Sequence, residues 1–85
     1  MKHRVILLHP IVSEKTSIMM ENENKLEFKV PIGATKKEIK EAFEKRFGVK
    51  VAKINTKIDR NGKRALIKLA PPYKAEEIGM KIGIF

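Results

Sequence analysis

Two alternating segments around Asn61-Gly62 constrain the fold of this 85-residue chain more than any other feature. On both sides of the dipeptide, apolar residues recur mostly at alternate positions, which is the pattern of strands with one buried face. Asn-Gly favours a type I′ turn, because both central residues of that turn need a positive φ. The pattern predicts a tight hairpin of strands Val49–Asp59 and Lys63–Ala70, with Ala52, Ile54 and Ile58 on its buried face.

The rest of the chain predicts two further strands and three helices. Thr35 and Glu38 form a capping box that opens the most regular helix, and Gly48 closes it. By periodicity and capping, strands are expected at 4–8 and 25–30, and helices at 13–22, 35–47 and 75–82. The order β-α-β-α-β-β-α predicts an α+β fold: one domain spanning residues 1–85, a small sandwich in which helices pack on a mainly antiparallel four-stranded sheet.

Positive charge is concentrated in the predicted hairpin. Residues 50–74 contain eight Lys and Arg residues and one acid, and so carry seven of the nine net positive charges. A local field of this kind attracts a polyanion, and RNA, DNA and an anionic membrane surface are the candidates. The alternative is a solvated strand face whose lysines prevent aggregation. We expect phosphate binding through Lys53, Asn55 and Lys57 on one strand face and through Arg60, Lys63 and Arg64 around the turn.

The residue types that many kinds of chemistry require are missing or badly placed. The chain has no Cys, which excludes disulfides, zinc knuckles and thiol nucleophiles and fits a reducing cytosol. His3 and His9 lack partners at metal-ligand spacing, and no nucleophile elbow, glycine-rich phosphate loop or paired-carboxylate motif occurs. The apolar run near the N-terminus is too short to span a bilayer. We expect no enzymatic activity, no catalytic residue, no metal or cofactor, and no membrane insertion.

The aromatic residues bear on the kind of nucleic acid. Phe28, Phe43 and Phe47 fall on predicted core faces, which leaves few rings to stack on bases. Contact with structured RNA through its backbone and shape is therefore favoured over reading of single-stranded bases. A stand-alone DNA-binding β-ribbon, which would need a two-fold dimer with paired ribbons, stays an alternative, as does a protein-docking adaptor.

Several segments, in order, also resemble one known family. They are HPIVSEKT (9–16), LEFKV (26–30), ATKKEIKEA (34–42), FGVKV (47–51) and INT (54–56). Over nearly its whole length the chain resembles the universal large-subunit ribosomal protein family L-twenty-three, in its short archaeal form. The resemblance implies a structural ribonucleoprotein constituent, active in translation on cytoplasmic ribosomes. It would bind the third domain of large-subunit rRNA beside the exit of the polypeptide tunnel.

The resemblance also implies partners and residue roles. Glu14 would belong to a docking surface for the signal recognition particle and nascent-chain chaperones, and ribosomal protein L-twenty-nine would lie alongside. Bacterial relatives carry a long basic extension in the hairpin loop, whereas this loop is short, so a tunnel-lining role is not expected. In the family, the Lys of the Ser-Glu-Lys motif and the Thr-Lys and Asn-Thr pairs lie toward RNA. With the basic hairpin, the expected RNA-binding set is Lys15, Thr35, Lys36, Lys40, Lys53, Asn55, Thr56, Lys57, Arg60, Lys63, Arg64 and Lys68.

Overall fold

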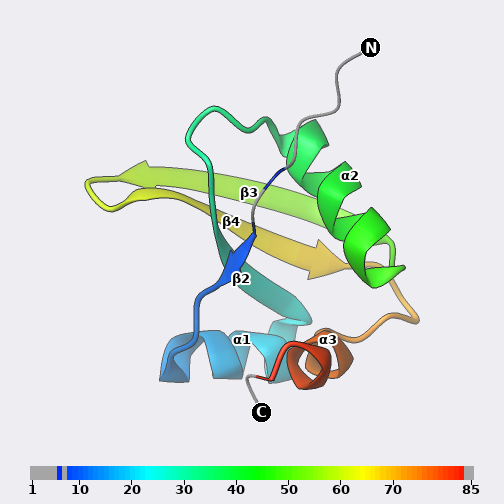
Figure 1. Ribbon diagram of the computed structural model, residues 1–85. Coiled ribbons are helices and arrows are strands. Elements are labelled where there is room, and N and C mark those ends of the chain that lie inside the picture. The colour runs from blue at the N-terminus through cyan, green and yellow to red at the C-terminus, as the bar shows by residue number, and fades with distance from the viewer. Residues whose placement is uncertain (1–5, 7, 84–85) are drawn as a thin grey trace.

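Within residues 6 and 8–83, the part that the computed structural model describes, the elements follow the order β-α-β-α-β-β-α (Figure 1). This confirms the expected α+β class. Of the strand expected at 4–8, residues 4, 5 and 7 lie outside the described part, and Ile6 and Leu8 are not in a strand. The elements are β1 (His9–Pro10), α1 (Glu14–Glu23), β2 (Lys25–Val30), α2 (Lys36–Phe47), β3 (Val51–Asp59), β4 (Gly62–Leu69) and α3 (Ala75–Lys81).

The four strands form one antiparallel sheet in the order β1-β2-β4-β3. The central pairs run from Lys25 opposite Lys68 to Val30 opposite Lys63, and the hairpin closes with Asp59 opposite Gly62. Because side chains alternate across a strand, this register defines two faces. The inner face carries Leu26, Phe28, Val30, Val51, Ile54, Ala65, Ile67 and Leu69, all buried. The outer face carries Lys25, Glu27, Lys29, Lys53, Asn55, Lys57, Arg64, Leu66 and Lys68.

The core lies against the inner face of the sheet. Phe28 of β2 meets two rings of α2: its centroid is 5.5 Å from that of Phe43 in an edge-on arrangement and 6.3 Å from that of Phe47. Such aromatic pairs add to the stabilisation gained from burying their area. Ile78 of α3 and Met20 of α1 join the same cluster, so all three helices contribute to one core. Helices α1 and α3 lie side by side below the sheet (Figure 1).

Helix boundaries follow local capping chemistry. Ser13 caps α1 through the Thr16 amide, and Thr16 returns a bond to the Ser13 backbone N–H. The capping box expected at Thr35 and Glu38 is confirmed, with bonds of 3.1 and 2.9 Å. At the other end of α2, Gly48 takes φ 67, a conformation that a residue without Cβ adopts at little cost. The caps at Thr35 and Gly48 therefore set the two ends of α2.

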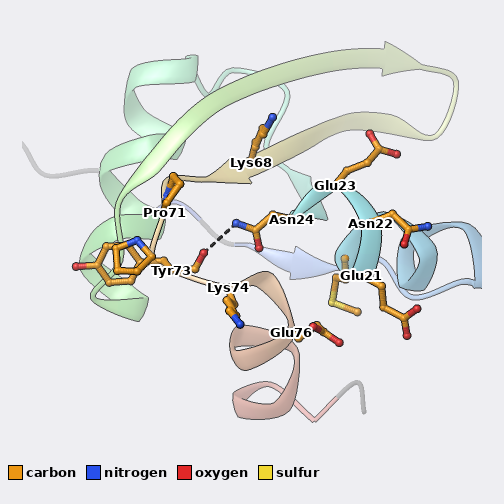
Figure 2. Close-up of a pocket in the computed structure, with 11 residues that line it drawn as sticks. Glu21, Asn22, Glu23, Asn24, Lys68, Pro71, Tyr73, Lys74 and Glu76 are labelled. Atoms are coloured by element: carbon orange, nitrogen blue, oxygen red, sulfur yellow. Dashed lines mark hydrogen bonds between the residues drawn. The ribbon is translucent and has the colours of Figure 1, made fainter.

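Asn24 ends α1 and connects it to the C-terminal part of the fold. It is the one non-glycine residue of the described chain with a positive φ, 56°, which Asn tolerates better than most residues. Its Nδ2 donates to the carbonyls of Leu69 (3.2 Å) and Tyr73 (2.9 Å), and its Oδ1 accepts from the Ala75 N–H (2.7 Å). The Asn24–Tyr73 bond is drawn in Figure 2. One side chain therefore joins α1, the end of β4 and the start of α3.

Three details of the predicted hairpin are wrong. Asn61 does not have the positive φ of a type I′ turn, because the loop is Arg60-Asn61 and only Gly62 takes a positive φ, at 121°. The carboxylate of Asp59 accepts from the Asn61 N–H at 2.8 Å and stabilises this alternative loop. A bulge between Val51 and Lys53 leaves Ala52 exposed instead of buried. Ile58, also expected in the core, is 63% exposed because the hairpin tip extends past the helices.

Candidate nucleic-acid interface

The outer face of the sheet gathers cations into rows across three strands. Lys53, Lys68 and Lys25 stand opposite one another on β3, β4 and β2. Two positions further along each strand, the row is Asn55, Leu66 and Glu27, and two further it is Lys57, Arg64 and Lys29. His9 of β1 extends the last row beyond Lys29. Like charges directly opposite one another destabilise a sheet, so these rows weaken the free fold and favour a bound anion.

Two carboxylates beside Arg64 partly balance this charge. Arg64 lies 3.0 Å from the Asp59 carboxylate and 3.8 Å from that of Glu27. Lys25 pairs with Glu23 at 3.0 Å, at the edge of the face. Lys29, Lys53, Lys57 and Lys68 are exposed and carry no such ion pair within the described residues. The four lysines are therefore the outer-face cations most available to phosphate.

The hairpin tip divides the cations that were expected to surround it. Arg60 is exposed in the loop. Lys63 stands on the inner side, opposite Ile58, and its ammonium donates to the backbone carbonyls of Ile32 and Ala34. It thereby ties the tip to the β2–α2 loop. Thr56 also belongs to the inner side and is half-buried. Lys63 and Arg64 thus lie on opposite faces of the hairpin, and Arg60 lies in the loop between the strands.

The first turns of α2 come close to the start of β3. Here a surface depression, which we call the notch, is lined by Lys36, Lys37, Lys40, Val51, Ala52, Lys53 and Ile54. All of its charged lining residues are lysines. The hydroxyl of Thr35 is already engaged as the helix cap. The notch brings Lys36 and Lys40 together with Lys53, which the sequence could place only on separate elements.

On α1, Glu14 and Lys15 border the same shallow groove. Ile18, Met19 and Glu23 complete its lining, and Ile18 is 49% exposed. The family resemblance implies that Glu14 contacts docking proteins and that Lys15 contacts RNA. Glu14 and Lys15 are therefore neighbours on one surface, about a third of a helical turn apart.

Three outer-face or contact residues were missed from the sequence. Lys25 and Lys29 alternate visibly with apolar residues, but only the pairing of β2 with β4 places them beside the basic hairpin. Asn24 lies in a polar segment whose sequence predicts only a turn. It lines a pocket with Lys68, Tyr73 and Lys74 between α1 and α3 (Figure 2). Neither the strand order nor this contact leaves a signal in the local sequence.

Some chemistry is not assembled in the described part of the chain. It contains no group of three or more His, Asp or Glu side chains that could hold a metal ion. None of its helices has the length and apolar character needed to cross a bilayer.

The fold and this surface define a class: small, strongly basic α+β domains that display Lys and Arg across an antiparallel sheet. Residues 5–71 match the family model described as ribosomal protein L23. The "large ribosomal subunit protein uL23" of Picrophilus torridus is 53% identical over 79 residues, covering 93% of this chain and 96% of the relative. That of Thermoplasma acidophilum is 49% identical over 80 residues, covering 94% and 95%. The chain belongs to the ribosomal protein L23 family, whose two relatives named here are proteins of the large ribosomal subunit.

Membership in this family makes the chain a ribosomal protein of archaeal type, located on the ribosome. The family match ends at residue 71, before α3 begins at Ala75. Because the first relative covers 79 of the 85 residues, its likeness extends past residue 71 into α3. The short C-terminal helix therefore belongs to the region that this chain shares with that relative.

Proposed function

We propose that this chain is a non-catalytic component of the large ribosomal subunit that binds large-subunit rRNA through the outer face of its sheet. The supporting observation is the arrangement of the exposed lysines 29, 53, 57 and 68 in cross-strand rows. Lysines at this spacing contact phosphate oxygens and release counterions when they do so. Binding also relieves the repulsion between lysines that stand opposite one another.

The geometry supports recognition of folded RNA through its backbone. All three aromatic rings of the Phe28, Phe43 and Phe47 cluster are engaged with one another beneath the sheet. The outer face offers Asn55 and half-buried Leu66 between the two basic rows, and no Phe, Tyr or Trp side chain among the residues that the structure describes. Asn55 is suited to a sugar hydroxyl or a base edge, while the flanking lysines hold the phosphates.

The test is neutralisation of three outer-face lysines. The variant Lys29→Gln, Lys57→Gln, Lys68→Gln is compared with Lys45→Gln, Lys50→Gln, Lys81→Gln, which removes the same charge at other exposed positions. Binding to a fragment of the third domain of large-subunit rRNA is measured against salt concentration. The outer-face variant should lose about 100-fold in affinity near 0.1 M salt and reduce the slope of log K against log salt by about 2 to 3. Equal losses in both variants would contradict an outer-face site.

A second role, protein docking beside the polypeptide exit, is favoured by the α1 groove. Glu14 and exposed Ile18 border this groove, and Val12 just before α1 is 55% exposed. Exposed apolar side chains next to charges are typical of a recognition surface. We propose that Glu14 and Ile18 of α1 contact the signal recognition particle or nascent-chain chaperones while the outer face of the sheet holds rRNA. Ribosomes carrying Glu14→Lys should bind such factors at least tenfold more weakly, with subunit assembly unchanged, whereas unaltered factor binding would rule out this role.

A further inference from the structure

The free edge of β3 is the feature that the proposed outer-face contacts leave unexplained. We propose that this edge enters the bound RNA: the backbone N–H groups of Ile54, Thr56 and Ile58 donate to phosphate or 2′-hydroxyl oxygens, and lysines on both sides hold the strand there. The inference deepens the proposed function and depends on it. It adds a backbone element to a surface so far described by side chains.

The direction of these amides follows from the register. β3 is the last strand of the order β1-β2-β4-β3, so in the described part of the chain one of its sides has no neighbouring strand. The Leu69 N–H donates to the Asn24 carbonyl at 3.1 Å, which shows that odd-numbered residues at this end of β4 bond toward β2. The Ala70 N–H donates toward β3, to the Lys50 carbonyl at 2.9 Å. Since antiparallel bonding alternates, the β3 residues opposite odd-numbered β4 residues point away from the sheet. These are Ile54, Thr56 and Ile58, opposite Ile67, Ala65 and Lys63.

Among residues 6 and 8–83, a protein acceptor is found only for the first outward donor of this edge. The Val51 N–H bonds to the Glu44 carboxylate of α2 at 2.8 Å. For Ile54, Thr56 and Ile58, no protein acceptor occurs among residues 6 and 8–83. Their three N–H groups are two residues apart, about 6.8 Å between successive donors. A row of open amides is therefore available to an acceptor-rich ligand.

Cations lie on both sides of this row. Lys53 and Lys57 of β3 stand on the outer face, and the notch adds Lys36, Lys37 and Lys40 from α2. Lys53 belongs to both surfaces, because it stands in an outer-face row and also lines the notch. The acidic residue Glu44 lies near the start of β3, where its carboxylate already accepts the Val51 N–H. The basic surface thus continues from the outer face, around the edge of β3, to the start of α2.

RNA fits this edge better than an added protein strand does. Lysines along an edge and a bulge near its start, here at Ala52, are two devices that discourage strand pairing. Phosphate and ribose oxygens accept from amides and ammonium groups alike. The wide, shallow minor groove of A-form RNA displays 2′-hydroxyls that a strand edge can reach. One polyanion can therefore use the amides and both lysine groups at once.

The test removes one outward amide. Thr56→Pro deletes that N–H while the bonds of the neighbouring residues to β4 stay in place, and proline is tolerated on an edge where its missing N–H faces solvent. Thr56→Val is the control, because it removes the hydroxyl and keeps the amide. Full-length chains are titrated with the rRNA fragment named above. Thr56→Pro should bind at least about tenfold more weakly than Thr56→Val, with the same salt slope, because no cation has been removed.

A second pair of variants tests the proposal even if Thr56→Pro does not fold. Lys36→Gln with Lys40→Gln changes exposed positions of α2 alone, and Lys45→Gln with Lys50→Gln is its control. The first pair should reduce the salt slope by about 1 to 2 more than the second. If Thr56→Pro binds like Thr56→Val, or if it unfolds and the lysine pairs are indistinguishable, the edge does not enter the RNA. In that case a loss in the outer-face triple variant would still support the proposed function, whereas no loss there would overturn the function as well.

Discussion

The carboxamide of Asn24 and the backbone N–H of Ala75 are 51 residues apart in sequence and 2.7 Å apart in the fold. This bond caps the start of α3, whose N-cap residue Lys74 has no side-chain cap of its own. Because the same carboxamide holds the carbonyls of Leu69 and Tyr73, the docking of α3 depends heavily on one residue.

Asn24→Ala should therefore destabilise the protein by about 2–4 kcal/mol. The variant leaves three backbone groups without their hydrogen-bond partner, and it places an alanine in the left-handed conformation at φ 56. Equilibrium urea unfolding measures the change. Asn24→Gly is the matched control: it relieves the backbone conformation and still loses the three bonds. A loss equal in both variants would assign the effect to the bonds alone, and no loss in either would contradict this account of α3.

The aromatic cluster predicts a second effect on stability. Phe43 is fully buried and packs against Phe28 and Phe47. Phe43→Ala should cost about 3–5 kcal/mol, a large part of the total for a domain of this size. Met80→Ala, at a site 62% exposed, should change the free energy of unfolding by less than about 0.5 kcal/mol. Similar unfolding midpoints for the two variants would place the core elsewhere.

Variants at Thr35 distinguish a structural role from an RNA-binding role at the start of α2. Its hydroxyl accepts the Glu38 N–H, so Thr35→Ala should lower stability by about 1 kcal/mol. Thr35→Ser keeps the capping oxygen and should restore it. Affinity of the folded variants for rRNA, measured well below their unfolding temperatures, should be the same for Ala and Ser. A weaker Ala variant under those conditions would show that the hydroxyl also contacts RNA.

Asp59 restrains the charge of the outer face. Its carboxylate lies 3.0 Å from the guanidinium of Arg64, and Asp59→Asn removes this ion pair while keeping an acceptor for the Asn61 N–H. The variant should bind rRNA about fivefold more tightly near 0.1 M salt and show a steeper salt dependence. Stability should change by about 1 kcal/mol or less, as for other exposed ion pairs. Glu76→Gln on α3 controls for the gain of one net charge.

Local chemistry made some parts of the structure predictable. The capping box of α2, the alternation in β2 and the tight hairpin are signals within a few residues. The first two are found where expected, and the hairpin forms with its loop one residue earlier. Long-range relationships were not predictable in this way. The pairing of β2 with β4 brings Lys25 and Lys29 beside the basic hairpin, and Lys53, which follows the bulge at Ala52, lines the notch with residues of α2. Both depend on how strands meet, which no single segment encodes.

The same distinction explains the errors at the hairpin tip. Asn61-Gly62 alone favours a type I′ turn, yet the Asp59 carboxylate bonds the Asn61 amide and the loop moves one residue back. Ile58 keeps its place in the alternating pattern but has no helix above it to bury it. Alternation predicts which face a side chain occupies; whether that face is covered is a property of the assembled domain.

The bond from the Lys63 ammonium to the β2–α2 loop has a kinetic meaning as well. A hairpin arm tethered near its tip is preorganised, so little conformational entropy remains to be lost when it meets its target. This arm should then associate as a rigid body, so that its association rate depends on charge and salt concentration more than on rearrangement of the chain.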